Sequence, residues 1–122
     1  MSNEPVHRDW IKLWIKDSLI GTIREDLTPD ERSIWWDFLL LAGHNRIPGQ
    51  ISANDASPIP IRRMAGILNA PEALIKRCIT KFEESGRIEV DKNKCIRIIN
   101  WSKYQYSDYD RQKKWREKNR NA

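Results

Sequence analysis

Residues 58–101 read PIPIRRMAGILNAPEALIKRCITKFEESGRIEVDKNKCIRIINW, and they contain two helical patterns separated by a tight turn. The first pattern spans Pro60–Leu68. The turn Asn69-Ala70-Pro71 then places a proline at the first position of the second pattern, where helices favour it. Two β-rich segments follow directly. This order predicts a helix-turn-helix followed by a β-hairpin, which is the winged-helix arrangement.

The second helix is predicted over Pro71–Ser85, and its two sides differ in chemistry. The apolar side carries Leu74, Ile75, Cys78, Ile79 and Phe82. The opposite side carries Ala73, Lys76, Arg77, Thr80 and Glu84. Two adjacent cations and a hydroxyl suit a helix in the major groove of DNA, where Lys and Arg reach guanine edges or phosphates. A solvated face is the alternative for an arbitrary amphipathic helix, but the flanking hairpin favours DNA contact.

The β-rich segments Arg87–Val90 and Cys95–Ile99 are separated by a four-residue turn cluster, which predicts a hairpin. Four apolar residues can share one face of it: Ile88, Val90, Ile96 and Ile98. Lys92 and Lys94 make the tip of this wing basic, so we expect them to contact phosphates. The candidate DNA-binding residues of the two helices and the wing are Arg62, Arg63, Ala73, Lys76, Arg77, Thr80, Lys81, Lys92 and Lys94.

A long central helix is predicted to begin at Thr28-Pro29-Asp30-Glu31. Thr28 is a suitable N-cap, Pro29 suits the first helical position, and Glu31 can close a capping box. The helix should run to about Ala42 and stop at Gly43. Its apolar stripe consists of Ile34, Trp35, Phe38, Leu39, Leu41 and Ala42. Trp36 and Leu40 lie off this stripe and are available for a second contact.

Four other segments have weaker patterns. Trp10–Lys16 alternates like a half-exposed strand, with a helix as the alternative because Trp10 and Trp14 are four residues apart. Asp17–Asp26 predicts a short helix with Leu19, Ile20 and Ile23 facing inward. The proline-rich residues 46–60 form mostly loop, with a strand at Gln50–Ala53. Trp101–Tyr106 should extend the last strand or pack across the body.

The C-terminal end carries most of the net charge. Residues 102–122 hold seven Lys/Arg and three acids, a balance of +4 out of +5 for the whole chain. The sequence therefore predicts a winged-helix domain over residues 1–106 and a basic tail over 107–122 that is weakly helical or disordered. Four cations of the tail complete the candidate DNA-binding set: Arg111, Lys113, Lys114 and Arg116.

Several other classes of function are disfavoured by the sequence. Cys78 and Cys95 have no metal-ligand spacing and read as reduced packing residues of an intracellular protein. No glycine-rich phosphate loop or GxSxG elbow occurs, so we expect no enzyme activity and no cofactor. No apolar run is long enough to span a membrane, and the N-terminus lacks an apolar signal region. We expect a cytoplasmic, nucleoid-associated protein with no membrane partner.

Four groups of residues resemble those of a known family. They are Trp10-Ile11-Lys12-Leu13; Asp26-Leu27-Thr28-Pro29 with Trp35 and Leu39–Gly43; Phe82-Glu83-Glu84-Ser85-Gly86-Arg87-Ile88; and Ile98-Ile99-Asn100-Trp101-Ser102-Lys103-Tyr104-Gln105. Over nearly all of residues 9–120 the chain resembles the N-terminal domain of phage replisome organisers, a DnaD-like winged helix. The resemblance implies a DNA-binding domain of replication initiators that bind origin DNA and help to recruit the helicase-loading machinery. A separate C-terminal domain commonly follows in such proteins.

Two functions from different classes stay open. In the first, the helix at 71–85, the wing and the tail bind double-stranded DNA, in replication or as a transcriptional regulator. In the second, the winged helix is mainly a module for self-association or for docking a replication protein such as the helicase loader. The interface would then be formed by Trp10, Trp14, Trp36 and Leu40.

Overall fold

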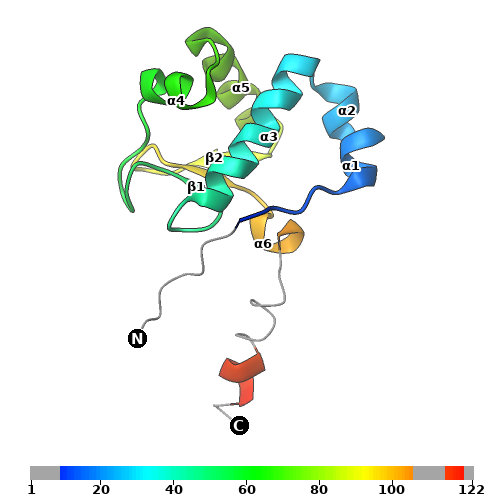
Figure 1. The fold of residues 1–122 in the computed structure, drawn as a ribbon, viewed down its shortest axis with the longest axis vertical. Coiled ribbons are helices and arrows are strands. Elements are labelled where there is room, and N and C mark those ends of the chain that lie inside the picture. The colour runs from blue at the N-terminus through cyan, green and yellow to red at the C-terminus, as the bar shows by residue number, and fades with distance from the viewer. Residues whose placement is uncertain (1–8, 106–114, 120–122) are drawn as a thin grey trace.

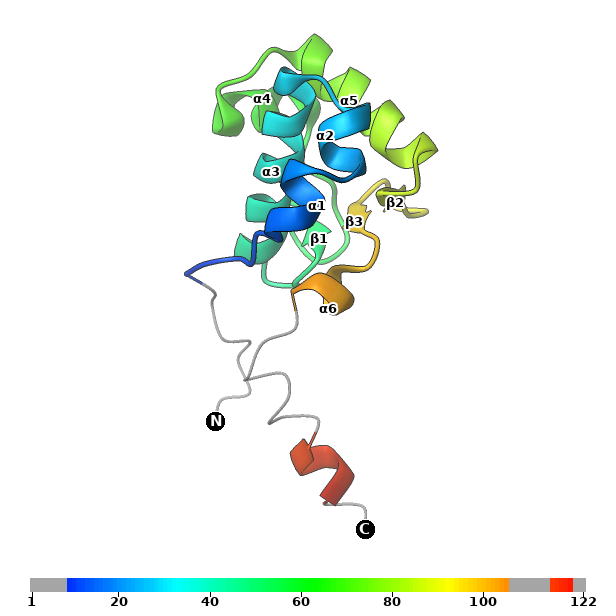
Figure 2. The same cartoon turned by 90° about the vertical axis from the view of Figure 1, so that its right-hand side faces the viewer.

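The computed structural model describes residues 9–105 and 115–119. The elements in chain order are α1 (Ile15–Leu19), α2 (Thr22–Asp26), α3 (Pro29–His44), β1 (Gln50–Ile51), α4 (Ile61–Leu68), α5 (Glu72–Glu84), β2 (Ile88–Val90), β3 (Ile96–Ile98) and α6 (Trp101–Tyr104). Helix α3 runs through the middle, with α1 and α2 on one side and the α4–α5 pair on the other (Figure 1). The side view shows α6 beyond the sheet, at the far end from α5 (Figure 2).

From α3 to β3 the order is helix, strand, two helices and two strands. The strands form an antiparallel sheet in which β3 lies between β1 and β2. In the hairpin, Ile88 pairs with Ile98 and Val90 with Ile96, so the predicted shared apolar face is confirmed. The mainly helical chain with its small sheet has the predicted α+β, winged-helix-like fold.

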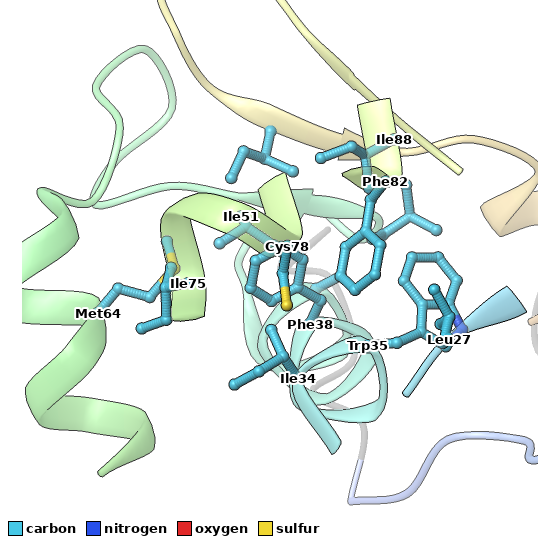
Figure 3. Packing of buried hydrophobic residues seen from close by; sticks show 13 residues of the cluster. Leu27, Ile34, Trp35, Phe38, Ile51, Met64, Ile75, Cys78, Phe82 and Ile88 are labelled. Carbon is cyan, nitrogen blue, oxygen red and sulfur yellow. The ribbon is translucent and has the colours of Figure 1, made fainter. Parts of the chain in front are cut away.

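The core lies where α3 and α5 pack together against the sheet (Figure 3). Phe82 of α5 packs edge-on against Trp35 and Phe38 of α3, with ring centroids 5.3 Å and 5.6 Å apart. Such aromatic pairs add about 0.5–1.5 kcal/mol to the free energy gained from burial alone. Cys78 and Cys95 are buried free thiols, which confirms their predicted packing role. The core therefore fixes α5 directly on the central helix.

The predicted start of α3 is confirmed, because Thr28 and Glu31 form the capping box. Its predicted end is wrong by two residues: the helix continues through Gly43 to His44. Gly43 is buried, and a Cβ there would lie 2.8 Å from the Cγ2 atom of Ile11. The glycine thus lets the N-terminal segment cross the helix closely, and it does not stop the helix.

The predicted strand at Trp10–Lys16 is wrong. Residues 10–14 have no regular secondary structure, and α1 begins at Ile15. A side chain replaces the missing strand partner: the Lys12 amide donates to Oε1 of Gln105 (2.8 Å), and Nε2 of Gln105 donates to the Lys12 carbonyl (2.9 Å). The Trp14 indole also donates to the Tyr104 carbonyl, at 2.8 Å. These bonds tie the N-terminal segment to α6.

The helix predicted over Asp17–Asp26 is two short helices that are interrupted at Ile20 and Gly21. A Cβ on Gly21 would lie 2.9 Å from the Asp17 carbonyl oxygen, so the sharp turn favours glycine. This turn leaves Leu19 and Ile20 exposed, against the prediction that they face inward. Ile23 is half-buried and does pack against the core.

The structure decides between the two alternatives predicted for the segment that begins at Trp101. Trp101–Tyr104 forms α6 and does not extend β3, because Asn100 adopts a left-handed conformation (φ 66°) that turns the chain. Packing across the body is the alternative that holds, since Trp101 lies against Gly43 and Gly49.

Strand β1 occupies two of the four residues predicted at Gln50–Ala53. Most of the predicted tail at 107–122 lies outside the described residues.

Candidate nucleic-acid interface

Helices α4 and α5 are joined by a turn that the sequence determines locally. Asn69 ends α4 in the left-handed conformation (φ 52°). Pro71 is the N-cap residue of α5, one residue before the first helical position predicted for it, and the helix spans Glu72–Glu84 instead of Pro71–Ser85. The Ala70 amide donates to the Ala65 carbonyl at 3.0 Å, which closes the turn. Met64 faces the core, whereas Arg62 and Arg63 are exposed on α4.

The predicted division of α5 into two sides is confirmed. Ile75, Cys78 and Phe82 are buried. The opposite side exposes Ala73, Lys76, Arg77 and Thr80. Lys81 is half-buried and lies on the edge that faces α3. The candidate residues of the second helix thus lie on one accessible face, except for Lys81.

Two of these cations are already engaged by the first turn of α3. Arg77 contacts Asp30 (Nη2 to Oδ2, 2.9 Å) and Glu31 (Nε to Oε2, 3.3 Å). Lys81 contacts Oε1 of Glu31 at 2.7 Å. The same oxygen accepts the Thr28 amide at 2.9 Å, as part of the capping box. Glu31 therefore joins the start of α3 to the flank of α5.

The carboxylates of this cluster are stabilised in their charged forms. Burial would raise the pKa of Glu31, whose side chain is 5 % exposed, but hydrogen bonds from Lys81 and Thr28 lower it to about 2. The pKa of Asp30 is lowered by its hydrogen bond from the Thr28 hydroxyl and by Arg77. Both groups remain ionised at neutral pH, so the cluster holds two negative and two positive charges.

The cluster was not predicted from the sequence. The capping box did single out Glu31, because Thr28 and Glu31 are three residues apart. Its partners Arg77 and Lys81 are 46 and 50 residues further along the chain. No local spacing pairs residues over such separations, and only the packing of α3 on α5 brings them together.

Other cations of the candidate set are not neutralised in this way. Within residues 9–105 and 115–119, no ion pair engages Arg62, Arg63 or Lys76. All three side chains are exposed. Their charge is therefore available to an anionic partner over the surface of α4 and α5.

The wing is short and well defined. Oδ1 of Asp91 accepts the amides of Asn93 (2.8 Å) and Cys95 (2.9 Å), which closes the turn between β2 and β3. Lys92 and Lys94 are exposed at its tip, as predicted. Lys94 has a φ of 70°, a left-handed conformation that lysine adopts at some cost. The wing thus presents two cations on a tight loop.

The tail candidates are only partly placed. Arg111, Lys113 and Lys114 lie outside the described residues, whereas Arg116 is exposed in a helical stretch at 115–119.

Among the described residues, no group of three His, Cys, Asp or Glu side chains could hold a metal ion. In that same part of the chain, no helix is long and apolar enough to cross a membrane.

Comparison with known proteins gives one match. Residues 10–122 match the family model described as the N-terminal phage replisome organiser. No curated protein and no solved structure matches the chain.

Proposed function

This chain belongs to the N-terminal phage replisome organiser family, and we propose on that premise that it binds double-stranded DNA in the initiation of phage replication. Helix α5 would lie in the major groove, with Lys76 and Thr80 directed at base edges. Arg62, Arg63 and the wing lysines would contact the phosphates on either side. The proposal assigns the chain no enzyme activity and places it on DNA in the cytoplasm.

The observation that carries the proposal is the exposed face of α5 beside cations that lack an acidic partner among the described residues. Helix α5 follows a tight turn, is fixed on the core by its apolar side and exposes Lys76 and Thr80. This arrangement suits binding in a DNA groove. Arg77 and Lys81, in contrast, form ion pairs with the first turn of α3. They hold α5 on α3, and contact of Arg77 with DNA requires it to leave Asp30.

Replacing Lys76 tests this proposal. We expect Lys76→Ala to weaken binding to a site selected from random duplexes by roughly 5- to 150-fold, because a lost base contact costs about 1–3 kcal/mol. Fluorescence anisotropy with labelled duplex would measure the dissociation constant. Lys16→Ala is the matched control, since Lys16 is also an exposed helical lysine but lies on α1. Equal effects of the two substitutions would show that Lys76 does not contact the DNA.

A second candidate function, self-association, is favoured by a specific surface. Six large side chains around α1 are exposed and define an N-terminal apolar patch: Trp10, Leu13, Trp14, Ile15, Leu19 and Ile20. Single exposed apolar side chains are common on monomers, but six such side chains within residues 10–20 are typical of an interaction site. Of the other two residues predicted for this interface, Trp36 is half-buried against the core and Leu40 is 55 % exposed. We propose that any dimer uses the patch around α1.

We expect the chain to form a dimer whose population rises with concentration in sedimentation experiments. Ile15 is 78 % exposed, so Ile15→Glu should leave the fold intact and weaken the dimer by roughly 10-fold or more, because it would bury a charge. Ile67→Glu is the matched control, since Ile67 is also exposed but lies on α4. A chain that stays monomeric at its highest soluble concentration would rule out this candidate.

A further inference from the structure

Asp30 holds Arg77 on the accessible face of α5. The two side chains are 53 % and 54 % exposed, and the Arg77 Nη2 atom lies 2.9 Å from Oδ2 of Asp30. Asp30 is itself held in place, because its Oδ1 atom accepts the Thr28 hydroxyl and the Glu31 amide. The carboxylate therefore stays next to the guanidinium without needing to be ordered by it.

Arg77 is next in sequence to Lys76, which has no acidic partner among the described residues. A guanidinium that is bound to a carboxylate is neutralised locally, so it does not displace a counterion from the DNA phosphates. The ion pair is half-exposed, so its strength is modest. A phosphate can therefore compete with Asp30 for the outer edge of Arg77, which is the Nη2 atom of the guanidinium. The inner Nε atom can keep its contact with Glu31 during this exchange.

We propose that Asp30 limits the affinity of this chain for DNA by withholding Arg77 from the phosphate backbone. This inference rests on the proposed DNA-binding function and adds a determinant of its strength. Without Asp30, the outer edge of Arg77 is available to one more phosphate. The effect is independent of sequence, because phosphate contacts carry no base information.

The test is Asp30→Asn, which removes the charge but can keep the hydrogen bonds with Thr28 and Glu31. We expect binding to a labelled mixed-sequence duplex to tighten about 3- to 10-fold at 0.1 M salt. The slope of log affinity against log salt should steepen by about 0.9, which is one phosphate contact. In the double variant Asp30→Asn with Arg77→Ala, both gains should disappear, relative to Arg77→Ala alone.

Asp55→Asn is the matched control. Asp55 also pairs with an exposed arginine, Arg46, so this substitution removes the same charge and frees the same kind of side chain. Arg46 lies just beyond the C-terminal end of α3, whereas Asp30 lies in its first turn, so the two ion pairs are at opposite ends of the helix. We expect Asp55→Asn to change affinity by less than roughly 2-fold, which is the share of a general charge effect.

Equal effects of Asp30→Asn and Asp55→Asn would overturn the inference, and so would a gain that persists without Arg77. If Lys76→Ala weakens binding while Asp30→Asn changes nothing, only the inference fails and the proposed function stands. If neither the unmodified chain nor Asp30→Asn binds the duplex at low salt, the proposed function fails and the inference falls with it. Thermal unfolding of each variant checks that the fold is retained.

Discussion

Replacing Arg111, Lys113, Lys114 and Arg116 with glutamine should weaken binding to any duplex by roughly 100- to 1000-fold at 0.1 M salt. These residues belong to the segment that carries +4 of the net charge of +5. Each phosphate that a cation neutralises contributes about 0.9 to the slope of log affinity against log salt. Loss of four contacts should therefore flatten the slope by roughly 3 to 4, and the ratio between specific and non-specific affinity should hardly change.

A salt titration of the dissociation constant by anisotropy measures both quantities. The control replaces Lys16 and Lys103, two exposed lysines away from α5, with glutamine and gives the change in slope per lost charge. If the slope stays unaltered in the fourfold variant, the basic tail makes no contact with DNA. The affinity of the chain would then have to come from α4, α5 and the wing alone.

Glu31→Ala should lower the free energy of unfolding by about 3 kcal/mol. The capping box is worth about 1 kcal/mol, and hydrogen bonds to charged partners contribute about 1.5–3 kcal/mol each. We discount the latter because Arg77 and Lys81 stay partly solvated when Glu31 is removed. For a domain of this size, the expected change lowers the melting temperature by roughly 15 °C.

The dependence of stability on pH gives an independent check. The pKa of Glu31 falls from its ordinary 4.5 to about 2 on folding, so its contribution is fully present above pH 4.5. It is lost progressively as the pH falls toward 2. The difference in unfolding free energy between the unmodified chain and Glu31→Ala should therefore shrink over this window.

Glu31→Gln separates the two roles of the side chain. Its amide oxygen can still accept the Thr28 amide, whereas the ion pairs with α5 are lost. We expect a loss intermediate between zero and that of Glu31→Ala, measured by denaturant unfolding. Equal stability of Glu31→Gln and the unmodified chain would show that the ion pairs with Arg77 and Lys81 contribute nothing to holding α5.

Local signals predicted the parts of the fold that the sequence determines over a few residues. The capping box at Thr28 and Glu31, the turn before Pro71, the two sides of α5 and the hairpin from Arg87 were all confirmed. Each depends on helical or strand periodicity, or on the chemistry of a cap or turn. The exposed cations of the candidate interface followed from the same periodicity.

Features that depend on distant partners were missed. Residues 10–14 alternate like a strand, yet they pair with the Gln105 side chain, 93 residues away from Lys12. Leu19 and Ile20 read as core residues because they are apolar, but the turn at Gly21 leaves them exposed. The engagement of Arg77 by Asp30 likewise arises only from the packing of α3 against α5. Such contacts decide which of the exposed cations are available to bind an anionic partner.

We propose above all that α5 and its neighbouring cations bind DNA. Titration of an isotope-labelled chain with a duplex, followed by NMR, shows which residues the DNA contacts. We expect that the backbone resonances perturbed most belong to Arg62, Ala73, Lys76, Thr80 and Lys92, while those of α1 stay unchanged. Perturbations confined to the N-terminal apolar patch, or none at all at low salt, would contradict it.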